Sequence, residues 1–202
     1  MPGRLFQRAP LVDVAAALGT QTDLTDPPRA NIAPGQEVVV FDGTLRRMRW
    51  GIVPVGRVNA RGRPVMEQII NARSETVFEK SAYEGTRRAV IPVQGWYEWT
   101  GEARRKTPWA IRDKTRPFLF FAAITDVWVA PGGREVPQVA AVTCSPSGDV
   151  RDIHHRMGVL LEAQDVPVWL TGDEEAAKAL MVPWPDGRLE VSAATSVDWD
   201  GP

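Results

Sequence analysis

The pattern of hydrophobic and polar positions predicts a chain built mainly from short strands. Residues 37–41 and 45–50 are strand-like runs, and the Asp42-Gly43 pair between them is typical of a hairpin turn. Later runs rich in β-branched and aromatic residues continue this pattern, and Pro131-Gly132-Gly133 predicts an exposed loop between the last two. The later strands are expected at residues 89–93, 96–99, 109–112, 118–124 and 138–143.

Helices are expected to be few and short. Residues 11–18 carry an alanine-rich helical pattern that Gly19 would end, and residues 76–82 fit a second short helix. Thr171-Gly172-Asp173-Glu174 resembles a capping box ahead of a late helix over residues 175–180. Many strands, few helices and 17 residues each of Gly and Pro favour the α+β class, as one β-rich domain over residues 1–202.

Composition limits the partners that the chain can attract. With 44% hydrophobic residues the chain is able to bury a full core, and its formal net charge of −1 gives no overall attraction for a polyanion. Any contact with DNA must therefore come from a local basic patch. Among several arginine clusters we favour residues 57–63, in a Gly- and Arg-rich stretch expected to be a surface loop.

The lone cysteine and the absence of long apolar runs suggest a cytoplasmic protein. Cys144 excludes an intramolecular disulfide, and its apolar, strand-like surroundings predict a buried structural thiol rather than a nucleophile. No apolar run approaches the length of a membrane span, and the first residues lack the apolar core of a signal peptide. We expect a monomer in the cytoplasm, without a membrane partner.

Two segments carry the residues best suited to catalysis. The only two histidines, His154 and His155, are adjacent, and histidine titrates near working pH. Glu98 lies within the aromatic run Trp96-Tyr97-Glu98-Trp99, where apolar surroundings would raise its pKa toward that of a general acid. The alternative is structural: one imidazole is solvated, the other satisfies a buried carbonyl, and Glu98 accepts from a backbone amide.

These segments and four others resemble the SOS-response-associated peptidase (SRAP) family, the abasic-site processing proteins of the DNA damage response. The matching pieces follow the family's order along most of the chain, and several ordered motifs together are specific where one alone would be weak. The resemblance implies a curved, barrel-like, antiparallel sheet with a groove for single-stranded DNA, and no metal or other cofactor. The pieces are Gly3-Arg4-Leu5-Phe6, Asn31-Ile32-Ala33-Pro34, Trp50-Gly51-Ile52-Val53-Pro54, Asn71-Ala72-Arg73-Ser74-Glu75-Thr76, Gly95-Trp96-Tyr97-Glu98-Trp99 and Ile153-His154-His155-Arg156-Met157.

The resemblance also implies a role for particular residues. It places Asn71, Glu98 and His154 around the amino terminus, where the Glu and His would move protons as an amine adds to an aldehyde. It assigns DNA contacts, mainly to phosphates, to Arg4, Pro34, Arg73 and Arg156. Read without the family, Asn71 is a turn residue and Arg73 pairs with Glu75. His155 is expected to be a structural or solvent-facing neighbour.

Position 2 is the main departure from the family pattern. Family members begin Met-Cys-Gly-Arg, and the exposed cysteine forms a thiazolidine with the aldehyde of an abasic site, whereas this chain has Pro2. Tryptophans that usually follow the Trp-Gly-x-x-Pro turn are replaced by Val55-Gly56-Arg57. Smaller departures are Ala30 in place of a tyrosine and Gly158 in place of a proline.

Pro2 leaves two interpretations open. If Met1 is removed, the secondary amine of Pro2, with a pKa of about 8 or above, would attack the aldehyde and form an iminium that favours β-elimination or hydrolysis. The chain would then be an abasic-site lyase. If Met1 is retained, the amine becomes an amide. The protein is then a non-covalent lesion binder, or a hydrolase of the SRAP (peptidase-like) type that acts on a small non-DNA substrate through Glu98 and His154.

Overall fold

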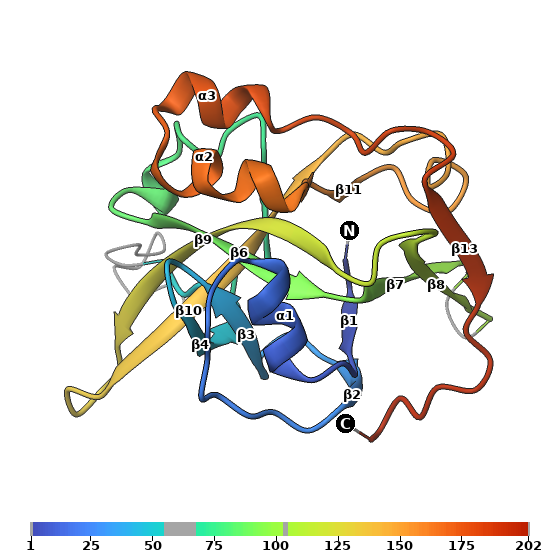
Figure 1. Cartoon of the computed structure of the whole chain (residues 1–202), viewed down its shortest axis with the longest axis horizontal. Coiled ribbons are helices and arrows are strands. Elements are labelled where there is room, and N and C mark those ends of the chain that lie inside the picture. Colours follow the sequence, from blue (N-terminus) through green and yellow to red (C-terminus); the bar gives the residue numbers. More distant parts are fainter. Residues whose placement is uncertain (1, 55–67, 103–104, 202) are drawn as a thin grey trace.

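The computed structural model describes residues 2–54, 68–102 and 105–201, which form two sheets and a few short helices (Figure 1). The strands are β1 Arg4–Gln7, β2 Arg29–Ile32, β3 Glu37–Phe41, β4 Leu45–Trp50, β5 Asn71–Arg73, β6 Arg87–Val93, β7 Gly95–Thr100, β8 Thr107–Asp113, β9 Leu119–Val129, β10 Glu135–Cys144, β11 Met157–Gly158, β12 Leu160–Leu161 and β13 Leu189–Ala193. The helices are α1 Leu11–Ala17, α2 Val166–Thr171 and α3 Glu174–Ala179, with 3-10 turns at Ser81–Tyr83 and Ala163–Asp165.

Five strands close into a barrel in the order β10-β4-β3-β6-β9, because β9 also pairs with β10. The β-rich α+β class with a barrel-like sheet is therefore confirmed. Most pairings are antiparallel, as expected, but β10 runs parallel to both β4 and β5. These two strands lie one after the other along the same edge of β10, since β4 pairs at Gln138–Val139 and β5 at Ala141–Thr143.

The second sheet has the order β13-β8-β7-β1-β2. Side chains alternate between the two faces of a strand, so Trp96 and Glu98 of β7 lie on one face and Tyr97 and Trp99 on the other. Trp96 is fully buried and meets the ring of Phe121 from β9 edge-on, with 5.4 Å between centroids. The inner face of β7 therefore packs against the barrel.

The helices lie outside the barrel. Helices α2 and α3 lie together at one end of the molecule (Figure 1), and the buried indole of Trp169 in α2 donates to the carbonyl of Ala89 in β6. The predicted helix over residues 11–18 is confirmed as α1. It ends where Gly19 adopts a φ of 66°, a conformation that glycine reaches at little cost. No described helix is both long and apolar enough to cross a membrane.

Two local predictions were wrong in detail. Residues 76–82 form isolated turns and a 3-10 turn rather than a helix, because the local hydrogen bonds to Thr76 and Lys80 are not propagated into a regular ladder. The late helix exists, but its cap is Asp173, whose Oδ1 accepts from Ala176 N at 2.8 Å. Thr171 instead ends helix α2, which the sequence pattern did not predict.

Candidate functional site

The first residues of the chain lie beside Glu98 because β1 pairs with β7. The register joins Arg4 with Tyr97 and Leu5 with Trp96, so Gly3 continues toward Glu98. Pro2 is buried, and its carbonyl oxygen accepts a hydrogen bond from Asn71 Nδ2 at 3.1 Å. Strand β5 holds Asn71 in place by pairing with β10 at Ala141. Three distant parts of the sequence thus meet at Pro2.

Glu98 has the environment that the aromatic run predicted. The residue is 3% exposed, and burial raises the pKa of its carboxyl to about 7. Near neutral pH a large fraction of the molecules therefore carry a proton on Glu98. A buried carboxyl that still holds its proton at this pH is suited to general acid catalysis.

His154 lies at the end of a tight turn whose backbone hydrogen bonds run from Ile153 N and His154 N to Val150 O, each 2.9 Å long. Burial lowers the pKa of His154 to about 4, so the ring is neutral at pH 7. Its Nδ1 lies 3.0 Å from Arg156 N and 3.1 Å from Arg156 O, which fixes the ring orientation for either tautomer. A neutral, oriented imidazole is suited to accept a proton. His155 is exposed and stacks on His154 at 4.3 Å, as a structural neighbour would.

One electrostatic effect connects these two side chains. The positive charge of the amino terminus, which belongs to Met1 in the full chain, lowers the pKa of both Glu98 and His154, in each case less than burial shifts it. Both groups therefore feel the same amino-terminal charge. This common influence is consistent with an acid–base pair arranged around the start of the chain.

Asn71 and Arg73 lie on the same face of β5, since they are two residues apart in a strand. Asn71 Oδ1 is buried and has no hydrogen-bond partner among the described residues. Arg73 is exposed, and its guanidinium contacts no described carboxylate. Both polar groups are available for a ligand.

Arg156, rather than Arg73, pairs with Glu75. Its guanidinium donates to both carboxylate oxygens of Glu75 and, at 2.5 Å, to the carbonyl of Thr143. The hydrogen bond from Arg156 lowers the pKa of Glu75 to about 2. The predicted ion pair between Arg73 and Glu75 is therefore wrong, because Arg156 is the partner of Glu75. Arg156 would have to exchange a carboxylate for a phosphate to bind DNA.

Arg4 lies on β1, and Pro34 follows β2, the neighbour of β1 in the second sheet. Arg4 Nη1 donates to Asn31 Oδ1 at 2.6 Å and to Trp199 O at 3.3 Å. Pro34 is half-buried in the turn between β2 and β3. Asn31 and Trp199 were not predicted as functional residues. Asn31 lies within the motif that contains Pro34, whereas nothing in the sequence connects Trp199 with Arg4.

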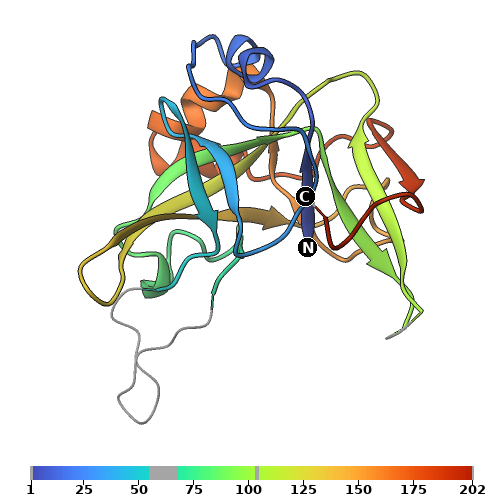
Figure 2. The ribbon, with the colours of Figure 1, turned by 90° about the horizontal axis from the view of Figure 1, so that it is seen from below.

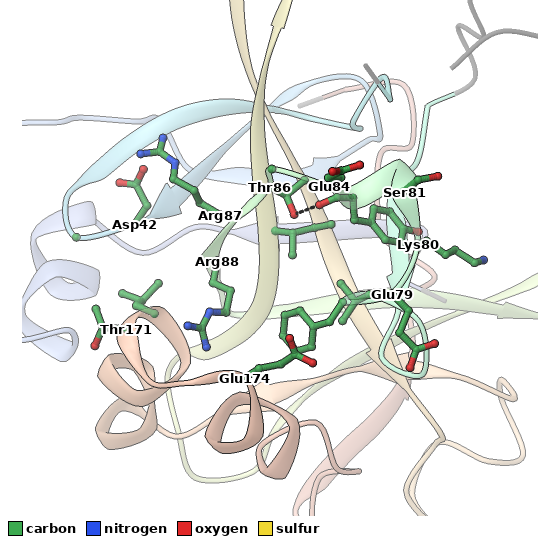
Figure 3. A pocket seen from close by; sticks show the side chains of 17 residues that line it. Asp42, Glu79, Lys80, Ser81, Glu84, Thr86, Arg87, Arg88, Thr171 and Glu174 are labelled. Carbon is green, nitrogen blue, oxygen red and sulfur yellow. Dashed lines mark hydrogen bonds between the residues drawn. The ribbon is translucent and has the colours of Figure 1, made fainter. Parts of the chain in front are cut away.

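A cleft of about 740 Å³ lies elsewhere, between the segment after β5 and helices α2 and α3, and shares no residue with this constellation (Figure 3). Some of the charged groups that line it, among them Asp42, Arg88 and Glu174, have partners within the protein. Arg88 donates to Gly172 O and lies 5.9 Å from the ring centre of Trp169, and Asp42 pairs with Arg46 at 3.1 Å. We assign no chemistry to this cleft.

Other predicted features have simpler outcomes. Cys144 is buried, and burial raises the pKa of its thiol to about 12, as expected for a structural cysteine. The basic stretch at residues 57–63 and the departures at 55–57 lie outside the described residues. Within the described ranges, no three His, Cys, Asp or Glu side chains gather closely enough to hold a metal ion.

Comparisons with known proteins agree on one family. The family model "SOS response associated peptidase (SRAP)" matches residues 1–197. The abasic site processing protein YobE of Bacillus subtilis is 29% identical over 84% of this chain and 82% of its own. The abasic site processing protein HMCES of Gallus gallus is 30% identical over 72% of this chain, which covers 51% of that longer protein. A crystal structure of a Bacteroides thetaiotaomicron protein superimposes with a TM-score of 0.80 at 22% identity, covering 96% of this chain and 92% of the other.

Proposed function

Because the chain belongs to the SRAP family, we propose that it processes abasic sites in single-stranded DNA, with the amine of Pro2 as the nucleophile. The observation that carries this proposal is the hydrogen bond from Asn71 to the carbonyl of Pro2. Pro2 directly precedes β1, which pairs with the strand that contains Glu98. An abasic site presents an aldehyde, and a secondary amine is a nucleophile for aldehydes. The relatives named as abasic site processing proteins support the substrate class.

The proposed covalent step conserves atoms and charge. After removal of Met1, the neutral amine of Pro2 adds to the aldehyde carbon and gives up its N–H proton to His154, while Glu98 protonates the oxygen. His154 then returns its proton to that oxygen, which leaves as water, and an iminium remains. The Glu98 carboxylate next removes a proton from the adjacent sugar carbon, and the 3′ phosphate leaves with the electrons of its bond. Water finally hydrolyses the iminium and releases the amine.

The pKa shifts suit these roles. A Glu98 pKa of about 7 leaves a proton on the acid and still yields a base after the proton is used. A His154 pKa of about 4 keeps its ring neutral at pH 7 and makes it a weaker base than an ordinary imidazole, so a proton that it takes from the nitrogen is readily passed on to the leaving oxygen. Asn71 Oδ1, without a described partner, would accept from the reacting nitrogen or a sugar hydroxyl.

Phosphate contacts are proposed for three arginines that differ in availability. Arg73 is exposed with its guanidinium clear of described carboxylates, whereas Arg156 is bound to Glu75 and Arg4 to Asn31. Arginine offers a planar set of donors that matches phosphate oxygens. We expect Arg73 to contribute directly and the other two after an exchange of partners. Pro34 is proposed as a van der Waals contact in the same path.

The experiment that tests this function is strand cleavage of a single-stranded oligonucleotide that carries one abasic site. The protein should cleave on the 3′ side of the lesion, and Glu98→Gln or His154→Ala should slow cleavage on the order of 10²-fold or more. Arg112→Ala serves as the matched control, because Arg112 pairs with Glu190 on β13 away from Pro2. No cleavage and no binding of the oligonucleotide would remove the proposal.

A second function rests on the residue at position 2. Should intact-mass measurement show that Met1 is retained, Pro2 has no amine, and we then propose either non-covalent lesion binding or a hydrolase that uses Glu98 and His154 on a small aldehyde, amine or ester. Binding to abasic DNA without cleavage favours the first, and absence of binding favours the second. In each case we expect a cytoplasmic monomer.

A further inference from the structure

The segment Asp198–Gly201 covers the outer face of β1 and β7. The end of the chain comes close to β1 (Figure 2), and its Trp199 contacts Tyr97 and Trp99, which lie on the face of β7 opposite to Glu98. The ring of Trp199 lies 5.0 Å from that of Tyr97, at 80°, and 5.2 Å from that of Trp99, at 56°. Trp199 therefore packs against the two aromatic residues that precede and follow Glu98 in the sequence.

The polar side of this contact converges on one buried amide. Asn31 is 2% exposed, and its Nδ2 donates to the carbonyl oxygens of Asp198, Trp199 and Gly201 at 3.2, 2.9 and 3.0 Å. Arg4 Nη1 donates both to Trp199 O and to Asn31 Oδ1. The segment thus supplies one acceptor, the carbonyl oxygen of Trp199, to Arg4, a residue that we assign to phosphate.

The segment folds locally and is held to the rest of the protein by the side chains of Arg4, Asn31 and Tyr97 rather than by a sheet. Asp198 Oδ1 accepts from the backbone amides of Asp200 and Gly201, at 3.0 and 3.1 Å, which makes a compact turn. No described strand pairs with this turn, and Trp199 is only half-buried. Segments without a strand ladder of backbone hydrogen bonds open at a lower free-energy cost than the strands of a core sheet. Asp198 and Asp200 are exposed, so the segment also brings two negative charges to the surface near Arg4.

We propose that the segment 198–201 is an internal competitor that occupies the Arg4 face until single-stranded DNA displaces it. This inference rests on the proposed function. The segment offers an aromatic ring to Tyr97 and Trp99 and one carbonyl oxygen to Arg4. A nucleotide would offer a base and a phosphate to the same groups. Both cannot occupy the face together. The acidic turn also repels a phosphate while it is closed. The apparent association constant for DNA is then the intrinsic constant multiplied by the fraction of molecules that are open.

Trp199→Ala tests the competition in the full chain. Binding of a short fluorescein-labelled single strand with a tetrahydrofuran abasic analogue is measured by fluorescence anisotropy at low salt. Removal of the ring should open the segment and tighten binding about tenfold. Trp128→Ala is the matched control, since Trp128 is also half-buried but lies on β9 in the hairpin with β10, and its dissociation constant should not change.

The outcomes separate the two proposals. Equal or weaker binding by Trp199→Ala, with clear binding by the unmodified protein, overturns the competitor and leaves the proposed function standing. Absence of binding by all three proteins overturns both. Hydrogen exchange on the unmodified protein needs no variant: amides of residues 198–201 should exchange faster when the oligonucleotide saturates the protein. Unchanged or slower exchange would contradict displacement even if the variant were unstable.

Discussion

Replacement of Glu98 by Gln should stabilise the protein above neutral pH while it slows the reaction. Glu98 is 3% exposed, and burial raises its pKa from 4.5 to about 7. The unfolded chain releases this proton near pH 4.5, but the folded protein keeps it until about pH 7. Stability therefore falls as pH rises through this window and is constant above it. The displacement from 4.5 to about 7 is equivalent to about 3 kcal/mol, because one pKa unit corresponds to 1.36 kcal/mol.

Urea unfolding followed by tryptophan fluorescence measures this effect. Relative to the unmodified protein, Glu98→Gln should gain about 3 kcal/mol between about pH 4.5 and pH 8, since glutamine resembles the protonated acid at every pH. Glu75→Gln is a control in which the change in stability with pH should have the opposite sign. The hydrogen bond from Arg156 lowers the pKa of Glu75 to about 2, so Glu75 stabilises the protein above its unfolded pKa and this stabilisation disappears as pH falls toward 2.

A stability difference between Glu98→Gln and the unmodified protein that does not change with pH would refute this reasoning. It would mean that Glu98 ionises normally and holds no proton at neutral pH. A less stable variant at pH 8 would contradict it further. The expected combination, a gain in stability together with a loss of activity, is the pattern of a residue kept at a cost for chemistry.

Three further predictions concern separate parts of the site. Arg73→Ala should make the dependence of single-stranded DNA affinity on salt shallower by about 0.7 in a log–log plot, because one phosphate contact is lost; an unchanged slope would exclude that contact. The pH–rate profile of abasic-site cleavage should lose its acidic limb near pH 4 in His154→Ala if that limb reports the base. Gly158→Ala should lower stability by roughly 1–3 kcal/mol in thermal unfolding, because a Cβ there would overlap the ring of Phe121; wild-type stability would mean that the ring moves freely.

The fold was predictable where a pattern is local. The hairpin of β3 and β4 appears at the expected residues because Asp42-Gly43 specifies the turn and the flanking residues specify the strands. Strand β13 was missed, since its residues acquire strand geometry by pairing with β8, which lies far earlier in the chain. Closure of the barrel through β9 and β10 likewise depends on pairing that no local run reveals.

The site was predictable from motifs but its contacts were not. The aromatic run around Glu98 correctly indicated burial and a raised pKa. The burial itself comes from the packing of the inner face of β7 against the barrel, because Tyr97 and Trp99 point to the other face. The pairing of Arg156 with Glu75 and of Arg4 with Asn31 joins residues far apart in the chain. The sequence suggested Arg73 as the partner of Glu75, because the two residues are close in the chain. Only the fold brings Arg156, in the turn before β11, next to Glu75.

Borohydride trapping tests the central claim most directly. The protein is incubated with single-stranded DNA that carries an abasic site, with and without borohydride, and is then denatured and separated by electrophoresis. If Pro2 is the nucleophile, a covalent complex should appear only with borohydride, because reduction converts the reversible iminium to a stable amine. Its mass should correspond to a chain that lacks Met1, with the DNA on the Pro2 nitrogen. An adduct that survives denaturation without borohydride, or no trapped complex at all, would contradict the account.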